Sequence, residues 1–240
     1  MSLFYDIHTH ILPGIDDGCK TPEESLLVIK EEIEQGCSGM IATPHYYSRE
    51  SIQDFLVKRE RSFEALKRCM SKELPQWEEK IKLGAEVAYT PFIAADQDLE
   101  KIRLGDSDFI LIEMPFMKWD RKVMRDIELI QRYHGLTPVI AHLERYRKYA
   151  DKGMVKELMD QGAAIQINAG MFRNFFDRIT AKKWIREGKV RVIATDTHNM
   201  SSRPPDIRLA REFLEKEKME DDWKRIADFS AALMKQPPHP

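Results

Sequence analysis

Cysteine is scarce in this sequence, neither sign of charge is in excess, and long apolar runs are absent. The three cysteines, Cys19, Cys37 and Cys69, form no CxxC pair, which argues against a disulfide framework and indicates a reducing compartment. No run of about 18 apolar residues occurs, and the amino terminus lacks the basic start and apolar stretch of a signal peptide. We therefore expect a cytoplasmic protein that is not inserted in a membrane.

The charge balance disfavours a nucleic-acid partner. The 38 lysines and arginines nearly match the 40 acidic residues, so the formal net charge is only -2, and no global electrostatic footprint for nucleic acid exists. A content of 42% apolar and 32% charged residues is typical of one folded domain with a sizeable core. We expect residues 1–236 to form this domain and the Pro-rich tail, residues 237–240, to be frayed.

Nucleotide-binding and thiol-phosphatase motifs are missing as well. Neither GxGxxG nor GxxxxGK[ST] occurs, which excludes the usual loops that bind phosphate groups of nucleotides. The C-x5-R pattern of thiol phosphatases fails at every cysteine, because the sixth following residue is Ser25, Thr43 or Pro75. If the chain is a phosphatase, it would therefore act without a covalent cysteine intermediate.

Short β-rich runs alternate with longer segments of helical period along the whole chain. The predicted strands are residues 3–10, 38–43, 81–86, 109–113, 138–142, 163–168 and 191–196. Because no break in composition separates these units, they predict one barrel of parallel strands ringed by helices. An open, doubly wound sheet is the alternative.

Several helix ends carry recognisable signals. Thr21 is expected to cap a helix with Pro22 in its first position, and Glu24 completes a capping box. Other predicted helices cover residues 48–71, 206–218 and 221–235, and helix-ending glycines are expected at Gly36, Gly162 and Gly188.

Five of the seven histidines lie at or just beyond the carboxyl end of a predicted strand. They are His8, His10, His45, His142 and His198. In a barrel of this kind that edge is where catalytic groups gather. His8 and His10 are two residues apart, so on a strand both imidazoles project from one face, and Asp196 and His198 repeat this spacing.

Carboxylates occupy equivalent positions. Glu86 and Glu113 end two predicted strands, and Asp16 and Asp17 lie on a turn soon after the first strand. Imidazoles and carboxylates that converge without cysteine favour hard or borderline divalent ions such as Mn, Fe or Zn. Because these ligands are too many for one ion, we expect several ions, an arrangement suited to phosphoester hydrolysis.

Four motifs, in order along the chain, resemble those of a known family. They are DIHTHILPGIDDG from Asp6, ATPH from Ala42, HLERY from His142, and DTHN from Asp196 with RPP from Arg203. The sequence resembles the PHP (polymerase and histidinol phosphatase) superfamily of metallohydrolases over nearly its whole length. More narrowly it resembles the CpsB/CapC branch, bacterial metal-dependent protein-tyrosine phosphatases associated with capsule and exopolysaccharide export.

The resemblance implies an α/β fold, a single-domain distorted (β/α)7 TIM-like barrel, with three metal ions, usually manganese. It assigns His8, His10, Glu86 and Asp196 to the first ion. Glu86 would bridge to a second ion bound by Glu113 and His142. Asp17, His45 and His198 would bind the third ion, with Asp16 as the alternative to Asp17. The substrate would be a tyrosine-phosphorylated protein, such as the tail of a bacterial tyrosine kinase.

Residues near these ligands are candidates for contacts with the substrate. We expect Arg145 and Arg203 to offer forked donors to phosphate oxygens and to contact only the substrate, with a surface ion pair as the alternative for either. Glu144 is a weak acid/base candidate, and a second water is the alternative. The aromatic segments 114–119 and 171–176 either grip a phosphotyrosine ring, form a subunit contact or seal the barrel.

Two other functions remain open. A small-molecule phosphatase acting on histidinol phosphate would use the same metal site. A non-catalytic metal-binding module would contain metal and turn over no phosphate ester. An amidohydrolase-type barrel is disfavoured, because neither its usual lysine nor an eighth unit is found.

Overall fold

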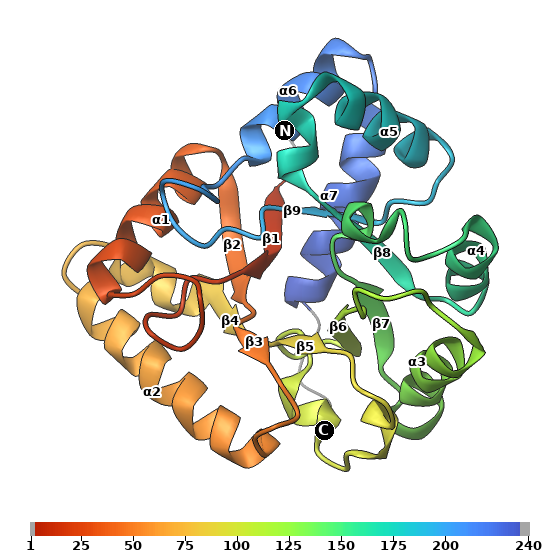
Figure 1. Ribbon diagram of the computed structural model, residues 1–240. Coiled ribbons are helices and arrows are strands. Elements are labelled where there is room, and N and C mark those ends of the chain that lie inside the picture. The colour runs from red at the N-terminus through yellow and green to blue at the C-terminus, as the bar shows by residue number, and fades with distance from the viewer. Residues whose placement is uncertain (1–2, 236–240) are drawn as a thin grey trace.

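The computed structural model describes residues 3–235, in which strands alternate with helices (Figure 1). The strands are β1 Phe4–Thr9, β2 Cys37–Ala42, β3 His45–Tyr46, β4 Ile81–Leu83, β5 Glu86–Ala88, β6 Phe109–Glu113, β7 Thr137–Ile140, β8 Ala164–Asn168 and β9 Val192–Ala194. The α-helices are α1 Pro22–Glu34, α2 Ile52–Met70, α3 Arg121–His134, α4 Lys152–Asp160, α5 Phe175–Arg186, α6 Ile207–Lys216 and α7 Glu220–Lys235. Short 3-10 helices are η1 Pro75–Lys80, η2 Ile93–Ala95, η3 Leu99–Ile102, η4 Leu143–Tyr146 and η5 Ala169–Arg173.

All paired strands are parallel and form one curled wall. Their orders are β1-β2-β4 in one sheet and β3-β5-β6-β7-β8-β9 in the other. The wall closes where β1 meets the segment after β9: Thr9 and Thr197 form a bridge, and the Asp196 N–H donates to the His8 carbonyl at 2.9 Å. The predicted distorted α/β barrel is confirmed.

The predicted strand over residues 81–86 is wrong as a single element. Its first half, β4, pairs with β2, and its second half, β5, pairs with β3. At the break, a Cβ on Gly84 would lie only 3.1 Å from the Ile41 side chain and 3.2 Å from the Arg103 carbonyl. Pro44 has no N–H with which to extend β2. The chains therefore separate here, and β3, which was not predicted, begins the second sheet.

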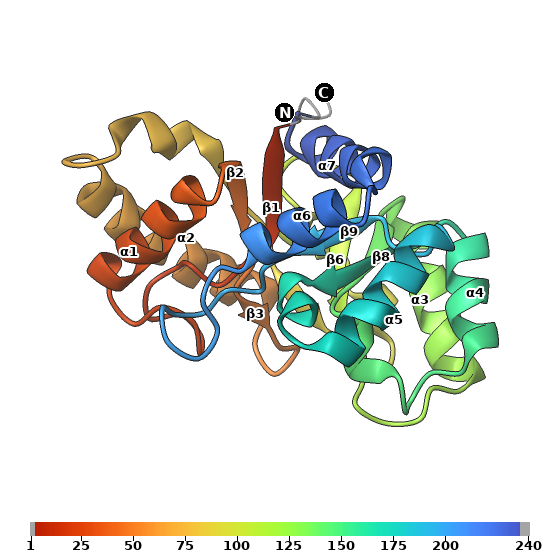
Figure 2. The same cartoon turned by 90° about the horizontal axis from the view of Figure 1, so that it is seen from above.

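Apolar side chains fill the barrel below its carboxyl-terminal edge. Ile7, Ile41, Leu111 and Val139 belong to this inner cluster, and Leu233 of α7 joins it. Figure 2 shows α7 beside the amino-terminal end of β1. A second apolar layer packs the surrounding helices against the strands. This leaves the carboxyl ends of the strands as the end where polar groups gather.

The helix signals agree with the structure, with small differences. The Thr21 side chain caps α1 as predicted, but Glu24 accepts from the Lys20 N–H at 2.7 Å, so the expected capping box is wrong. The predicted helix over residues 48–71 begins only at Ile52, because the Ser51 side chain caps it by accepting from the Asp54 N–H.

The predicted helix-ending glycines and terminal helices are confirmed, and the predicted tail lies outside the described residues. Gly36, Gly162 and Gly188 have positive φ angles of 94°, 95° and 69° after their helices. The two terminal helices are present as α6 and α7. The tail at residues 237–240 lies outside the described residues. Among residues 3–235, no helix has the length and apolar character needed to cross a membrane.

Candidate metal centre

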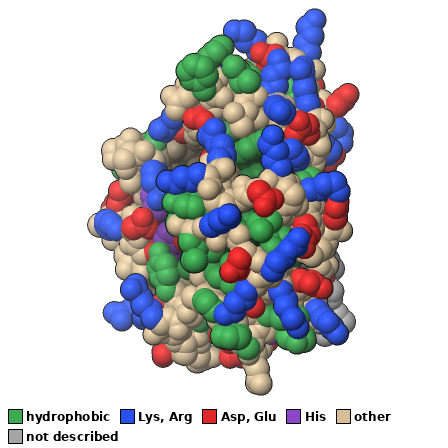
Figure 3. All heavy atoms as spheres, turned by 45° about the vertical axis from the view of Figure 1, so that its right-hand side comes forward, with side chains coloured by type: hydrophobic (Ala, Val, Ile, Leu, Met, Phe, Trp, Pro, Cys, Tyr) green, Lys and Arg blue, Asp and Glu red, His purple; other side chains and the backbone are tan. Residues whose placement is uncertain are grey.

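The imidazoles and carboxylates predicted from the sequence meet at the carboxyl-terminal edge of the barrel. Figure 3 shows histidine side chains in a recess at the left, with basic side chains beside it. His8 comes from β1, His45 and Glu86 begin β3 and β5, and Glu113 ends β6. The other residues lie in the segments after β1, β7 and β9. Donor atoms fall into three groups, each with its atoms within 4.8 Å of one another.

The first group consists of His8, His10, Glu86 and Asp196 and is fully buried. The Nε2 atoms of His8 and His10 face each other at 3.2 Å. Glu86 Oε2 lies 3.2 Å from each of these nitrogens, and Asp196 Oδ1 lies 3.4 Å from each. Ligands about 2.1 Å from a shared ion lie about 3.0–3.4 Å apart, so these separations suit a single divalent ion.

The second group is His45, Glu86 and Glu113, and His142 approaches Glu86 from outside this group, at its other oxygen. His142 Nε2 lies 2.7 Å from Glu86 Oε1 and 3.7 Å from Glu113 Oε1. His45, Glu86 and Glu113 also bring one donor atom each within 4.8 Å of one another. Glu86 therefore lies between two clusters of donors, in the position of a bridging carboxylate.

The third group lies nearer to solvent and distinguishes the two neighbouring aspartates. Asp17 Oδ1 lies 3.4 Å from His45 Nε2 and 3.2 Å from His198 Nε2. Asp16 instead lies 2.7 Å from His10 Nδ1, on the opposite side of that ring, and accepts the His45 backbone N–H at 3.0 Å. Asp17 thus has the geometry of a ligand, and Asp16 that of the residue orienting His10.

Two polar residues of β8 that the sequence analysis missed link the ligand residues through hydrogen bonds. The Gln166 carbonyl oxygen accepts from the His142 N–H at 2.6 Å and lies 3.2 Å from His8 Nδ1. Its amide donates to Asn168 Oδ1, and Asn168 Nδ2 donates to Asp196 Oδ2, both at 2.7 Å. The sequence signal that could have identified them is their alternation with Ile165 and Ile167 in β8, which places both polar side chains on one face of the strand.

Two of the ligand candidates have left-handed backbone conformations. The φ angles of His142 and Asp196 are 30° and 53°. Neither residue belongs to a strand, because β7 ends at Ile140 and β9 at Ala194, so the predicted strand ends at these residues are wrong. Such conformations are costly for non-glycine residues and concentrate at functional sites. Here they turn the two side chains inward.

Burial and neighbouring charge divide the histidines into two kinds. Burial lowers the pKa of His45 and of His142, and burial with the charge of His10 lowers the pKa of His198 to about 3. These three imidazoles are neutral at neutral pH and offer lone pairs. Burial also opposes protonation of His8 and His10, but the adjacent carboxylates outweigh it and raise the pKa of both.

The carboxylates show the same competition. Burial favours the neutral form of Glu86 and of Asp196, yet the surrounding histidines hold the pKa of each well below its usual range. Burial and the charge on Glu86 raise the pKa of Glu113 to about 7. Two carboxylates that repel each other in this way would be stabilised by a cation between them.

Unpaired buried atoms provide a further test of whether this donor set fits a metal. Within the described residues, Glu86 Oε2, His142 Nδ1 and His198 Nε2 are buried and have no hydrogen-bond partner. Buried polar atoms without partners are unfavourable. His142 faces Glu86 and Glu113 with its other ring nitrogen, Nε2. Divalent cations would satisfy Glu86 Oε2 and His198 Nε2, so these residues fit the metal ions that the sequence predicts.

The two candidate arginines are at the centre, but their contacts differ from the prediction. Arg145 donates to Asp196 Oδ2 at 2.5 Å, and Arg203 lies 2.7 Å from both oxygens of the same carboxylate. The expectation that they contact only the substrate is therefore wrong, because both form ion pairs with the buried Asp196. Arg203 also lies 3.6 Å from the exposed carboxylate of Asp17, in line with the ion-pair alternative. Both remain about one-third exposed, with side-chain exposures of 33% and 31%, so their outer donors can reach an incoming anion.

Other candidates surround the recess. Glu144, the neighbour of Arg145 in η4, accepts from the Asn168 N–H at 3.3 Å and has a pKa raised to about 7 by burial. In the aromatic segments, Trp119 and Phe172 are buried, whereas Phe116, Phe175 and Phe176 are 51%, 68% and 80% exposed. Tyr47, which the sequence analysis missed, packs against the ring of His45, with the ring centroids 5.5 Å apart and the planes tilted by 31°.

Among the described residues, the groups of metal-donor atoms contain no cysteine, although the Cys19 thiol donates to the backbone carbonyl of His198 at 3.6 Å. Cys19 and Cys37 are buried, and Cys69 is partly buried. Burial raises the pKa of Cys19 to about 11 and also raises the pKa of Cys37, so neither is a thiolate at neutral pH.

Comparison with known proteins identifies relatives across almost the whole chain. Residues 4–233 match the family model described as capsular polysaccharide synthesis, CpsB/CapC. The chain is 30% identical over 222 residues to tyrosine-protein phosphatase YwqE of Bacillus subtilis (strain 168), covering 88% of this chain and 84% of that protein. It is 33% identical over 231 residues to tyrosine-protein phosphatase CpsB of Streptococcus pneumoniae, covering 88% and 89%.

A solved structure supports the same relationship. The chain aligns with a TM-score of 0.82 and 27% identity, over 98% of each chain, to a chain from the crystal structures of YwqE from Bacillus subtilis and CpsB from Streptococcus pneumoniae, described as unique metal-dependent tyrosine phosphatases. Together with the family match over residues 4–233, these likenesses confirm the resemblance seen in the sequence motifs. The chain belongs to the CpsB/CapC family.

Proposed function

We propose that this protein is a metal-dependent protein-tyrosine phosphatase that hydrolyses phosphotyrosine with water as the nucleophile. The observation that carries the proposal is the convergence of five histidines and four carboxylates on one recess, without a thiol. Membership of a family whose relatives are named tyrosine-protein phosphatases supports the substrate class.

We assign the ligands to three divalent ions. His8, His10, Glu86 and Asp196 would bind the first ion. Glu86 would bridge to the second ion, bound also by Glu113 and His142, and Asp17, His45 and His198 would bind the third. Imidazole-rich sites favour transition metals over Mg, so manganese is the proposed metal, with iron or zinc as alternatives.

The protein's own groups bind and orient the phosphate. Ions bound here would acidify water toward neutrality and offset the negative charge of the phosphoester. Arg145 and Arg203 are held by Asp196 and stay about one-third exposed, so their remaining N–H groups would bind non-bridging phosphate oxygens. Gln166 and Asn168 keep His8 and Asp196 in position from below.

The ring of the substrate would lie among the aromatic side chains at the mouth. Tyr47 and Phe116 are both partly exposed, with 37% and 51% of their surfaces accessible. Phe116 packs against Tyr146 at 5.3 Å, which fixes its position beside η4. We propose that the physiological substrate is a tyrosine-phosphorylated protein, a bacterial tyrosine kinase that regulates capsule or exopolysaccharide synthesis.

A competition assay tests this function. The manganese-loaded protein is given a phosphotyrosine peptide, the same peptide with phosphoserine, and histidinol phosphate in separate and mixed reactions. Selective release of phosphate from the phosphotyrosine peptide supports the proposal. Preferential hydrolysis of histidinol phosphate would assign the site to a small-molecule phosphatase, and bound metal with no turnover of any ester would leave a metal-binding module.

A further inference from the structure

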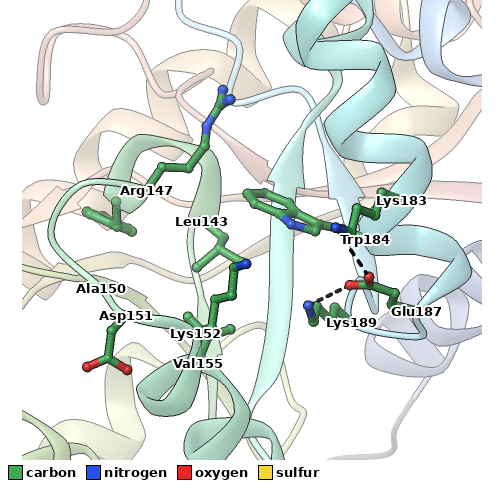
Figure 4. Close-up of a pocket in the computed structure, with 11 residues that line it drawn as sticks. Leu143, Arg147, Ala150, Asp151, Lys152, Val155, Lys183, Trp184, Glu187 and Lys189 are labelled. Atoms are coloured by element: carbon green, nitrogen blue, oxygen red, sulfur yellow. Dashed lines mark hydrogen bonds and ion pairs between the residues drawn. The ribbon is translucent and has the colours of Figure 1, made fainter.

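A pocket of about 350 Å³ lies behind η4, outside the metal centre (Figure 4). It opens between η4, α4 and α5. Its apolar lining includes Leu143, Ala150, Val155 and Trp184. In Figure 4 the Trp184 ring lies close to Leu143, with lysine side chains around it. The volume falls within the range of small-ligand sites, about 300–1,000 Å³.

The rim of this pocket carries more positive than negative charge. The charged lining residues are Arg147, Lys152, Lys183 and Lys189, opposed by Asp151 and Glu187. Glu187 is shared by two lysines, at 2.5 Å from Lys189 and 3.9 Å from Lys183. Within the described residues, Lys152 has no hydrogen bond or ion pair with a carboxylate. Arg147 pairs with Asp177 outside the pocket, so the cationic donors that the pocket can offer a ligand are Lys152 and Lys183, the latter only loosely paired with Glu187 at 3.9 Å.

One short helix separates the pocket from the metal centre. Leu143 and Tyr146 of η4 line the pocket, whereas Arg145, between them, pairs with Asp196 in the centre. The Tyr146 hydroxyl is occupied, since it accepts from the Met114 N–H at 3.0 Å. A ligand in the pocket would thus contact the back of the segment that carries Arg145 without reaching the metal ligands.

We infer that this pocket is a second binding site, specific for a planar aromatic group that carries a negative charge. The indole of Trp184 provides a stacking wall for the ring, and aromatic contacts add to the apolar burial. Lys152 and Lys183 provide charge-assisted donors for the anion. The same chemistry is offered by a free aryl carboxylate, sulfonate or phosphate and by a tyrosine beside an acidic residue in a peptide.

The test measures binding of 8-anilinonaphthalene-1-sulfonate to the full chain by its fluorescence. The charge-reversed double variant Lys152→Glu/Lys183→Glu should bind about tenfold more weakly, the effect of losing contacts to a charged group. Trp184→Leu should also weaken binding about tenfold by removing the ring. The matched control is Lys156→Glu on the same helix, because Lys156 is 72% exposed and pairs with Asp160 outside the pocket; it should bind like the parent.

Two further measurements identify the ligand chemistry and its source. The uncharged analogue N-phenyl-1-naphthylamine should bind the parent about tenfold more weakly than the sulfonate, because it lacks the anion. Displacement of the dye by 4-hydroxyphenylacetate alone would indicate a free small molecule, and displacement only by a Glu-Tyr-Glu peptide would indicate a protein ligand. Equal dye binding by the parent and by both pocket variants, with circular dichroism showing that all are folded, would overturn the inference, as would equal binding of the charged and uncharged dyes.

Discussion

Gln166 provides a sharp test of how the metal centre is positioned, because it contacts two ligand residues without being a ligand itself. Its carbonyl oxygen accepts from the His142 N–H and lies beside His8 Nδ1, and its amide is linked through Asn168 to Asp196. Gln166→Leu keeps much of the volume but removes the hydrogen bonds that Gln166 itself makes. His8 and His142 would then lose their direct support, and Asp196 would keep its bond from Asn168.

The size of the effect follows from those bonds. A buried N–H left without a partner costs about 1–3 kcal/mol, so Gln166→Leu should lower the free energy of unfolding by about that amount. Loss of a residue that orients metal ligands typically reduces metal affinity or activity by about 10–100-fold. We therefore expect the Mn concentration for half-maximal activity to rise by about 10–100-fold. Gln166→Glu restores the acceptor oxygen and should recover most of this loss.

The assay titrates the metal-depleted protein with Mn and follows hydrolysis of a phosphotyrosine peptide, with thermal melting measured alongside. Gln131→Leu is the matched control, since Gln131 is exposed on α3, and it should behave like the parent. If Gln166→Leu melts earlier but needs no more Mn than the parent, Gln166 supports the fold and does not position the ligands.

Three other predictions concern the phosphate clamp, a buried acid and the thiols. Arg203→Ala should lower kcat/KM for a phosphotyrosine peptide by about 10–1000-fold, the scale of a lost charge-stabilising donor; Arg203→Lys should rescue poorly, and parental rates in both variants would refute the clamp. Burial and the charge of Asp6 raise the pKa of Glu32 well above the usual 4.5, so the folded chain holds this proton more tightly and stability falls as pH rises above about 4.5. Glu32→Gln should flatten that fall in melting temperature between about pH 5 and about pH 8, and an unchanged slope would contradict the assignment. Alkylation of the cysteines should leave turnover intact. Inactivity of a folded variant in which Cys19, Cys37 and Cys69 are all replaced by serine would count against the thiol-free mechanism.

Much of the site was predictable because its ligands follow strands in short motifs. The two-residue spacing of His8 and His10 places both rings on one side of β1, and their Nε2 atoms do meet at 3.2 Å. Glu86 was predicted as the end of one strand, yet it begins β5 after a break at Gly84. It still reaches the centre because β5 pairs in register with β3, which places Glu86 opposite His45.

What the sequence could not reveal depends on contacts between distant segments. Gln166 and Asn168 are ordinary polar residues until the barrel brings His8, His142 and Asp196 above them. The choice between Asp16 and Asp17 depends on the direction of each side chain from one turn, which spacing does not specify. The arginines were predicted near the phosphate. Their shared ion pair with Asp196 was not predictable, because Arg145 and Asp196 are 51 residues apart in the sequence and meet only in the folded chain.

The central claim is that the converging histidines and carboxylates form a metal centre that hydrolyses phosphotyrosine. The most direct measurement removes all metal by chelation, verifies its loss by elemental analysis, and then follows phosphate release from a phosphotyrosine peptide as Mn or Mg is returned. The account predicts no turnover without metal, recovery that is greater with Mn than with Mg, and close to three Mn per chain at full activity. Full phosphotyrosine hydrolysis by a protein that contains no metal would contradict it.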